Sequence, residues 1–418
     1  MSPYFDINDT LKDITDKYPE TLPIFISRGF SQMADESMRK TFGATISLKT
    51  ALSLKKINID TFSTALEDRI KQESSIADIS MKSTQNNHQN EEKTLTDAIR
   101  VEGLLPCPVR LPLMEKFQIF INQFKESGKG EIQHELKAAS MGLDWLKVFV
   151  EKLDDPTQLP DILISAGFDL FFEEKHMGKF KRQNVFIDST GFPRLNSLFD
   201  NETLNLKDPA GHYSMIGVVP AILVVNTTEL NGRAIPKSWK DLLKPEYENS
   251  VSLPIADFDL FNAILLHLFK AYGPEAVQKL GRSLMESLHP SQMVKSSTRK
   301  TGKPLVTVMP YFFTKMLKEG GTMQAVWPDD GAIISPIFML TKRERIKLLQ
   351  PVIDFFASKE VGEILSYKGL APSIHPDIDN PVPPGKTFMW LGWDYIYSND
   401  IGNLAEKCKE LFNQGAIL

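Results

Sequence analysis

The chain has 418 residues, of which 42% are hydrophobic and 24% are charged, and its formal net charge is −5. This length exceeds one ordinary hydrophobic core and indicates about two or three domains. The acidic balance argues against general nucleic-acid binding, which requires a basic face, so we expect no nucleic-acid partner.

Cysteine usage and the start of the chain exclude further classes of protein. Cys107 and Cys408 are too few and too far apart for a disulfide framework, and no CxxC pair is present to hold zinc or an iron–sulfur cluster. The opening segment has neither the basic nor the apolar region of a secretory signal, and no apolar run reaches about 20 residues. We therefore expect no metal, no cofactor and no membrane insertion. The expected location is the cytoplasm, or the periplasm or cell exterior if a leader was trimmed.

Residues 1–72 are expected to form an all-helical mini-domain. Leu11, Ile14 and Tyr18 recur at helical spacing, and Ser47 is a suitable N-cap for a later short helix. Residues 73–100 are polar and poor in aromatic side chains, which predicts a linker. The main domain should then span residues 101–418.

From residue 101 onward, predicted strands and helices alternate. Short apolar runs that indicate buried strands lie at 161–168, 218–226, 250–255, 303–310 and 332–340. Amphipathic runs that indicate helices lie at 113–127, 261–273, 274–286 and 343–358. This alternation predicts an α/β fold with a mostly parallel sheet. The segment is long for one such sheet, so we expect two α/β lobes.

The central block carries a resemblance to a known family. Residues 217–230 read GVVPAILVVNTTEL, and residues 235–259 read IPKSWKDLLKPEYENSVSLPIADFD. Together they resemble the type II periplasmic, or extracellular, solute-binding proteins, in the branch associated with ferric iron, phosphonate and thiamine uptake. The matching residues are Val224, Val225, Asn226, Pro236, Ser238, Trp239, Asp241, Leu242, Pro245 and Tyr247.

The resemblance implies a fold and an N-terminal attachment. The fold is a two-lobe α/β domain with a hinge of two crossing strands, near 218–226 and 333–340. The first lobe would contain about 101–218 and 340–418, and the second about 226–333. Residues 5–72 resemble a small helical domain of uncharacterised function, but the usual cysteines after its GF pair are missing here. That removes a metal role and leaves interaction with a protein partner, or regulation.

Strand ends supply the first candidate site residues, because ligands of open α/β sheets lie beyond the carboxyl ends of strands. Residues 103–112 read GLLPCPVRLP and predict a first strand or extended entry. Cys107 follows this strand, and its thiol suits either a reactive position or a small buried one. Ser165 and Gly167 end the next strand, where a hydroxyl and open amides suit an anion or an ordinary turn. Asp257 and Asp259 mark a strand-to-helix turn, as ligand contacts or as helix caps.

Two further groups complete the candidate ligand-binding set. His212, Tyr213 and Ser214 precede the hinge strand and read as a pocket wall or as a surface loop. Tyr311 lies near the position where ferric-binding members of the family carry adjacent tyrosines, but phenylalanines follow it here. One phenolate without a partner makes a poor ferric site.

The leading hypothesis is therefore non-catalytic binding of a small anionic or organic solute in the cleft between the lobes. The chain would act as a cytosolic carrier or sensor, or as a substrate-binding protein of the ABC-transporter type. The alternatives are an enzyme that uses the same cleft with Cys107 or His212, and a protein-interaction scaffold. No catalytic residue is assigned.

Overall fold

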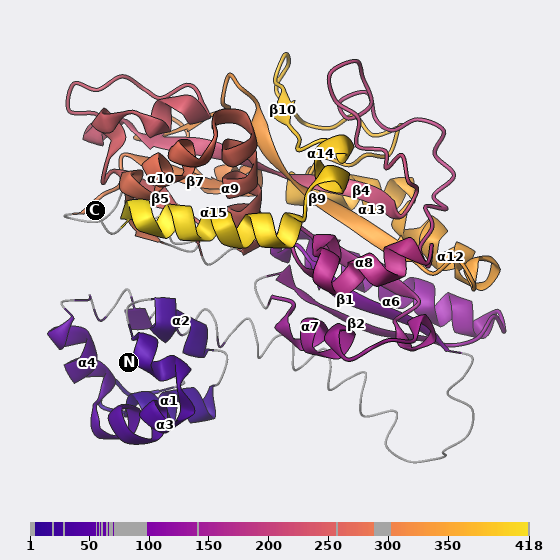
Figure 1. Cartoon of the computed structure of the whole chain (residues 1–418), viewed down its shortest axis with the longest axis horizontal. Coiled ribbons are helices and arrows are strands. Elements are labelled where there is room, and N and C mark those ends of the chain that lie inside the picture. The colour runs from indigo at the N-terminus through magenta and orange to yellow at the C-terminus, as the bar shows by residue number, and fades with distance from the viewer. Residues whose placement is uncertain are drawn as a thin grey trace. The chain divides into compact units, whose positions relative to one another are not determined.

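The computed structural model describes residues 5–18, 21–27, 30–55, 57, 59, 62–63, 66, 70, 98–139, 142–255, 258–287 and 302–416. The chain divides into two compact units, Met1–Leu95 and Thr96–Leu418 (Figure 1), and each is described by itself. Within the described residues, no helix has both the length and the apolar character that crossing a membrane requires.

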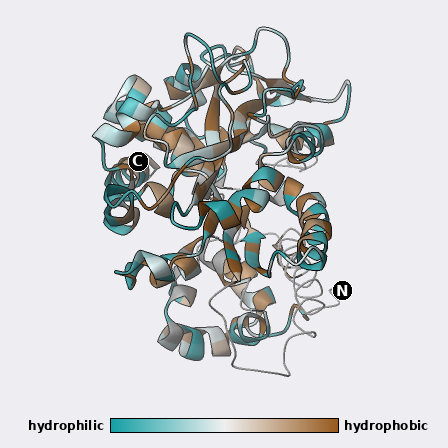
Figure 2. Ribbon diagram, turned by 90° about the vertical axis from the view of Figure 1, so that its right-hand side faces the viewer, coloured by the Kyte–Doolittle hydropathy of each residue, from teal (hydrophilic) through white to brown (hydrophobic). Residues whose placement is uncertain are grey.

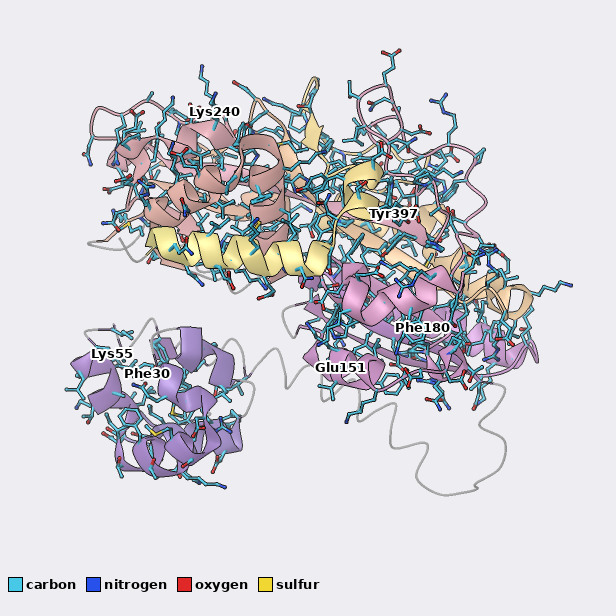
Figure 3. All side chains as sticks on the ribbon, in the orientation of Figure 1. Phe30, Lys55, Glu151, Phe180, Lys240 and Tyr397 are labelled. Atoms are coloured by element: carbon cyan, nitrogen blue, oxygen red, sulfur yellow. The ribbon has the colours of Figure 1, made fainter. Side chains whose placement is uncertain are left out.

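The N-terminal unit consists of short helices around an aromatic core. They are α1 (Leu11–Lys17), α2 (Leu22–Ser27), the 3-10 helix η2 (Ser31–Ala34), α3 (Glu36–Met38), the π-helix η3 (Arg39–Gly43) and α4 (Leu48–Leu54). Ser47 caps α4 by accepting a hydrogen bond from the Thr50 amide, as predicted. The rings of Phe25, Phe30 and Phe62 lie 5.2–6.2 Å apart. The Lys55 ammonium lies 5.3 Å from the Phe30 ring centre (Figure 3).

The described residues of the larger unit contain ten strands. They are β1 (Ile99–Leu105), β2 (Ile132–Ala138), β3 (Ile162–Ala166), β4 (Tyr213–Asn226), β5 (Val251–Leu253), β6 (Leu284–Ser287), β7 (Val306–Pro310), β8 (Met323–Val326), β9 (Ala332–Thr341) and β10 (Phe388–Met389). Their spatial order is β2-β1-β3-β9-β4-β7-β5-β6, with β10 beside β9 and β8 beside β4.

Strands β4 and β9 form the hinge that links two lobes. The first half of β4 pairs with β9 from Tyr213 to Ala221, and its second half pairs with β7 and β8 from Ala221 to Asn226. The two-lobe fold with crossing strands is thus confirmed. The hydrogen-bonded path, however, is one continuous sheet, whereas we expected a sheet in each lobe. The reason is that β4 is long enough to belong to both lobes.

Helices cover both faces of this sheet. They are α6 (Cys107–Glu126), α7 (Asp144–Glu151), α8 (Glu174–Arg182), α9 (Phe258–Tyr272), α10 (Pro274–Ser283), α12 (Ile346–Phe356), α13 (Lys359–Glu363), α14 (Trp393–Ser398) and α15 (Ile401–Ala416). Successive residues of β3 point to opposite faces. Ile164 therefore joins a core with α6 and α12, and Leu163 joins a larger core with α8, α9 and α15. Figure 2 shows hydrophobic residues, in brown, concentrated in the strands of the sheet.

The C-terminal helix lies on a different lobe from the one we expected. The sequence assigned residues 340–418 to the first lobe, but α15 packs against α9 and α10 of the second lobe (Figure 1). The helices approach closely because they meet at glycines. A Cβ added at Gly415 would lie 1.9 Å from the Gln278 carbonyl oxygen, and one added at Gly281 would lie 2.1 Å from the Phe412 carbonyl oxygen.

The segment that carries the family resemblance has a structural role. It forms the 3-10 helices η8 (Trp239–Leu243) and η9 (Pro245–Tyr247) before β5. Ser238 and Asp241 form a reciprocal capping box at the start of η8. The buried Trp239 indole donates to the Gly331 carbonyl over 2.9 Å, and its backbone amide donates to the Asp330 carboxylate. These bonds fasten η8 to the connection between β8 and β9.

Candidate functional site

Parallel pairing brings the carboxyl ends of β1 and β3 to the same edge of the sheet. Val101 pairs with Ile162 and Gly103 pairs with Ile164, so both strands end at one level. Gly103 permits this approach, since a Cβ at that position would lie 1.8 Å from the Ile164 carbonyl oxygen. Helix α6 begins directly after β1, and Pro106 at its N-cap supplies no side-chain cap. The first turn of a long helix and the loop after β3 thus share this edge.

The loop after β3 begins with a tight turn. Gly167 has a φ of +93°, and its amide donates to the Pro336 carbonyl over 2.8 Å. Ser165 is fully buried, and its hydroxyl lies 3.5 Å from a carboxyl oxygen of Asp169. Burial raises the pKa of Asp169 well above its ordinary value. This turn presents mainly backbone, and burial favours the protonated form of the carboxyl beside it.

Helix α9 of the second lobe meets the same loop. The Asn262 side-chain amide donates to the Phe168 carbonyl over 3.3 Å, and the Phe168 ring lies 6.0 Å from the His267 ring and 5.6 Å from the Trp390 ring. Burial lowers the pKa of His267 to about 4, so its imidazole is neutral at neutral pH. The two lobes are therefore in contact beside the strand ends.

Tyr311 follows β7 in the second lobe, at the start of the 3-10 helix η11 (Tyr311–Met316). Its ring makes an edge-on contact with Trp327 at 5.2 Å, and burial raises its pKa. Phe312 and Phe313 also pack edge-on against each other at 5.3 Å. The phenol ring therefore belongs to an aromatic group, and the described part of this group includes no second tyrosine.

Tyr213 and Ser214 lie in the core rather than on a pocket wall or in a surface loop. Tyr213 and Ser214 lie inside β4 and are almost fully buried, because the strand starts earlier than the apolar run alone suggested. The Tyr213 hydroxyl donates to the Phe171 carbonyl, and the Ser214 hydroxyl donates to Asp188, each over 2.8 Å. The His212 backbone amide donates to Asp208. Tyr213 and Ser214 are thus core residues with internal partners.

Three predicted site residues lie wholly or in their side chains outside the described residues. Asp257 lies outside the described residues, and so do the side chains of Cys107 and Asp259. The backbone places Cys107 at the first position of α6 and Asp259 at the second position of α9. Both positions follow strand ends, as the sequence predicted. Helix α6, however, already starts at Cys107, whereas the sequence indicated a helix only from residue 113.

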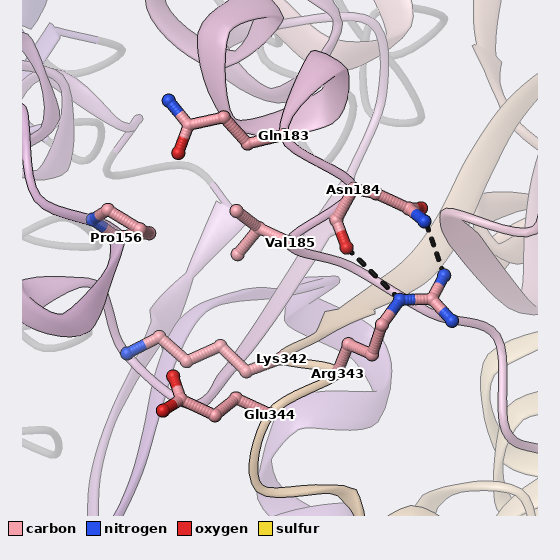
Figure 4. A pocket seen from close by; sticks show the side chains of 7 residues that line it. All are labelled: Pro156, Gln183, Asn184, Val185, Lys342, Arg343 and Glu344. Carbon is pink, nitrogen blue, oxygen red and sulfur yellow. Dashed lines mark hydrogen bonds between the residues drawn. The ribbon is translucent and has the colours of Figure 1, made fainter.

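A surface pocket lies elsewhere on the first lobe, where β9 ends. It has a volume of about 260 Å³ and is lined by Gln183, Asn184, Val185, Lys342 and Arg343 among others (Figure 4). Its cations already have partners. Lys342 donates to the Thr157 and Leu159 carbonyls, and Arg343 donates to Asn184. These bonds tie loops together, so the pocket offers a ligand little free charge.

A second surface pocket, of about 300 Å³, lies between residues 196–198 and the proline-rich segment 376–386. Its Asn196 and Asn380 side chains bond to neighbouring backbone and Ser366. Among the residues that the structure describes, no three His, Cys, Asp or Glu side chains gather as metal ligands.

Comparison with known protein families identifies the class. A family described as bacterial extracellular solute-binding protein matches residues 157–399, which is more than half of the chain, and the chain therefore belongs to this family. Residues 5–62 match a second family, described as a domain of unknown function. The resemblance read from residues 217–259 is thus confirmed. No curated protein sequence matches the chain significantly.

Solved structures share the fold at low sequence identity. A ferric binding protein from Campylobacter jejuni is 13% identical with a TM-score of 0.54, and the match covers 76% of this chain and 99% of that one. Apo FutA2 from Synechocystis PCC6803 is 11% identical with a TM-score of 0.54, covering 77% and 99%. An ABC transporter structure from Clostridium perfringens is 17% identical with a TM-score of 0.51, covering 75% and 100%.

These comparisons bear on two expectations. The family is defined by binding a solute, which agrees with the prediction of a binder rather than an enzyme. The expected cytoplasmic location finds no support, because the matched family is described as extracellular and a related structure is titled a periplasmic binding protein.

Sequence reasoning missed the residues that join the lobes. They are Phe168, Asn262 and His267, together with Lys315, whose ammonium donates to the carbonyls of Tyr367 and Lys368. The only signal for the two α9 residues was a pair of polar side chains in the otherwise apolar run FNAILLHLF, both now found buried. Phe168 and Lys315 had no signal, because their partners lie far away in sequence.

Proposed function

We propose that the chain binds a small anionic or organic solute between its two lobes, at the edge where β1 and β3 end. The observation that carries this proposal is the parallel register of Val101 with Ile162, which aligns the start of α6 with the turn at Gly167. Tyr311 and the start of α9 follow strands of the second lobe. Ligands of open α/β sheets bind in such a position.

The chemistry of this edge favours an anionic or organic solute over a bare metal ion. A helix start carries partial positive charge, and α6 begins there without a side-chain cap. Pro108 has no amide hydrogen and the Val109 amide donates to the Pro106 carbonyl, so the dipole rather than a set of open amides would attract an anion. At the neighbouring turn, the Gly167 amide already donates to the Pro336 carbonyl. Tyr311 contributes an aromatic surface with one hydroxyl. A carboxylate or phosphate on an organic body would use both kinds of contact. Cys107, Asp257 and Asp259 remain proposed contacts by their positions after strand ends.

Closure of the lobes would bury the solute. Strand β4 runs through both lobes and β9 returns beside it, so a small change of backbone angles near Ala221 would move one lobe against the other. This motion suits capture and release rather than chemistry. The enzyme alternative would require a base beside the Cys107 thiol, and the scaffold alternative would require that no solute be retained.

The solute-binding unit is attached to an N-terminal helical unit, and this attachment bears on the cellular role. We propose that it works as a carrier or sensor, or as the substrate-binding component of a transporter, and that residues 5–72 contact a protein partner. The polar segment 73–100 would act as the linker between the two units. Fractionation of the native host would establish the compartment.

Native mass spectrometry of the full chain purified from its own host tests the proposal. We expect the wild-type protein to retain a small molecule, and Tyr311→Ala to retain it at several-fold lower occupancy. Met316→Ala is the matched control, because Met316 lies on the same helix and is 45% exposed. A bare wild-type mass, or equal retention by Tyr311→Ala, would refute the proposed site.

A further inference from the structure

One exposed side chain joins the second lobe to the first. Lys315 lies on η11, and its ammonium donates to the carbonyls of Tyr367 over 2.8 Å and of Lys368 over 3.0 Å. Tyr367 and Lys368 end the π-helix η12 (Ile364–Lys368), which packs against α6 of the first lobe. The pair of bonds therefore bridges the two lobes at the protein surface.

The bridge has a sound electrostatic basis. The last carbonyls of a helix lack intrahelical partners and carry partial negative charge, so they attract a cation. Helix α13 and η12 run consecutively from Lys359 to Lys368, which aligns their peptide dipoles toward these carbonyls. The Lys315 ammonium also lies 5.7 Å from the Phe312 ring centre, which helps to hold its stem in place.

The bridge lies next to the proposed solute site. Gly369 follows η12 directly, and a Cβ there would lie 2.1 Å from a methyl group of Val109, so the end of η12 abuts the first turn of α6. On the other side, Tyr311 and Lys315 belong to the same short 3-10 helix. A solute that contacts Tyr311 would thus act on the helix that carries the bridging ammonium.

We propose that Lys315 is a latch that holds the lobes closed by binding the carbonyl end of η12, and that it sets how often the solute-free protein opens. The inference rests on the proposed function, since a latch matters only if the lobes move to admit a solute. Opening separates the ammonium from both carbonyls and the Asn262 amide from the Phe168 carbonyl, while the hinge strands keep their pairing. The latch therefore raises the closed population without touching the solute.

Single-molecule energy transfer on the full chain tests this latch. Dyes are placed on unnatural amino acids at Glu115 of α6 and Glu319 beyond η11, both exposed, and the native cysteines are left in place. Without solute, Lys315→Ala should raise the ratio of open to closed molecules about two- to five-fold, the range expected for one cation at a helix end. Lys315→Arg should restore the closed population, because it keeps the charge and the donors.

Lys318→Ala is the control, since Lys318 is exposed and close in sequence but lies beyond η11. Equal open fractions for Lys315→Ala and Lys318→Ala would overturn the latch, and so would one fixed distance in every variant. The retained mass measured above separates this failure from failure of the proposed function. If the protein retains a solute but Lys315→Ala leaves the ratio of open to closed molecules unchanged, only the latch is refuted. If the protein retains no solute but Lys315→Ala shifts this ratio, only the solute site is refuted.

Discussion

The side-chain amide of Asn262 and the backbone carbonyl of Phe168 are joined by a hydrogen bond of 3.3 Å that links α9 of the second lobe to the loop after β3 in the first. Both residues are buried, so neither group has water as an alternative partner. Together with the Phe168 ring against His267, this contact fixes how the lobes meet beside the strand ends.

Removal of this amide should destabilise the larger unit. Asn262→Ala leaves the Phe168 carbonyl buried without its donor, which costs about 1–3 kcal/mol of unfolding free energy. Urea unfolding of the full chain would measure the change. Asn122→Ala is the control, because Asn122 is exposed on α6 and bonds through its side chain only to Gln118. Equal stabilities of the two variants would contradict the importance of the contact.

Asp330 should contribute far more to the stability of the larger unit than its neighbour Asp329. The Asp330 carboxylate accepts the Trp239 amide at 3.0 and 3.1 Å and the Tyr272 hydroxyl at 2.8 Å. Asp330→Ala would leave two donors without this acceptor and loosen η8, so we expect a loss of about 2 kcal/mol or more in thermal or urea unfolding. Asp329 is exposed, and Asp329→Ala should change stability by less than about 0.5 kcal/mol. The reverse order would refute this account of η8.

Acid should destabilise the larger unit through His267. Its pKa is about 4 when folded, below the ordinary 6.5, so between these values the unfolded chain binds the proton more readily. The stability that neutral His267 contributes is complete above pH 6.5 and is lost as the pH falls toward 4. The full loss is on the order of 3 kcal/mol. Unfolding free energies of the wild type and of His267→Asn at pH 7 and pH 4.5 would measure it.

The variant is needed because other groups titrate in the same range. The raised pKa of Asp169 favours the folded state at low pH and opposes the effect of His267. The difference between wild type and His267→Asn cancels this contribution. We expect the variant to lose less stability on acidification than the wild type, and identical pH slopes would show that His267 is not buried as a neutral imidazole.

Ferric ion should bind weakly, although similar folds include proteins titled as ferric binding. Tyr311 packs on Trp327, and the next residues are Phe312 and Phe313, so a second phenolate is missing at this helix. Addition of ferric citrate should produce no strong visible band from phenolate-to-iron charge transfer. A purple-red band that disappears in Tyr311→Phe would contradict this expectation.

The general fold could be predicted because its signals are local. The alternation of apolar runs with helical patterns indicated α/β lobes, and the runs at 218–226 and 332–340 proved to lie inside the hinge strands β4 and β9. Such local patterns do not determine which strands pair with each other, so we did not predict the single continuous sheet. Nor did we predict the docking of α15, which depends on glycines of two distant helices, Gly281 and Gly415.

The candidate site was only partly predictable for a related reason. Ser165 and Gly167 lie at the end of a strand that the apolar run at 161–168 predicted. The structure brings that end beside the start of α6. Tyr213 and Ser214 indicated a pocket wall or a surface loop because they are polar, yet β4 already includes them and buries both. Contacts such as Asn262 with Phe168 depend on the closure of the lobes, which a linear pattern does not encode.

The most direct test of the account is a crystal structure of the full chain, purified from its own host with its retained solute. We predict density for a small molecule between the lobes, in contact with the turn at Gly167 and the ring of Tyr311. Density confined to the pocket beside Lys342 and Arg343, or an empty cleft in protein whose mass shows a bound solute, would contradict the central claim.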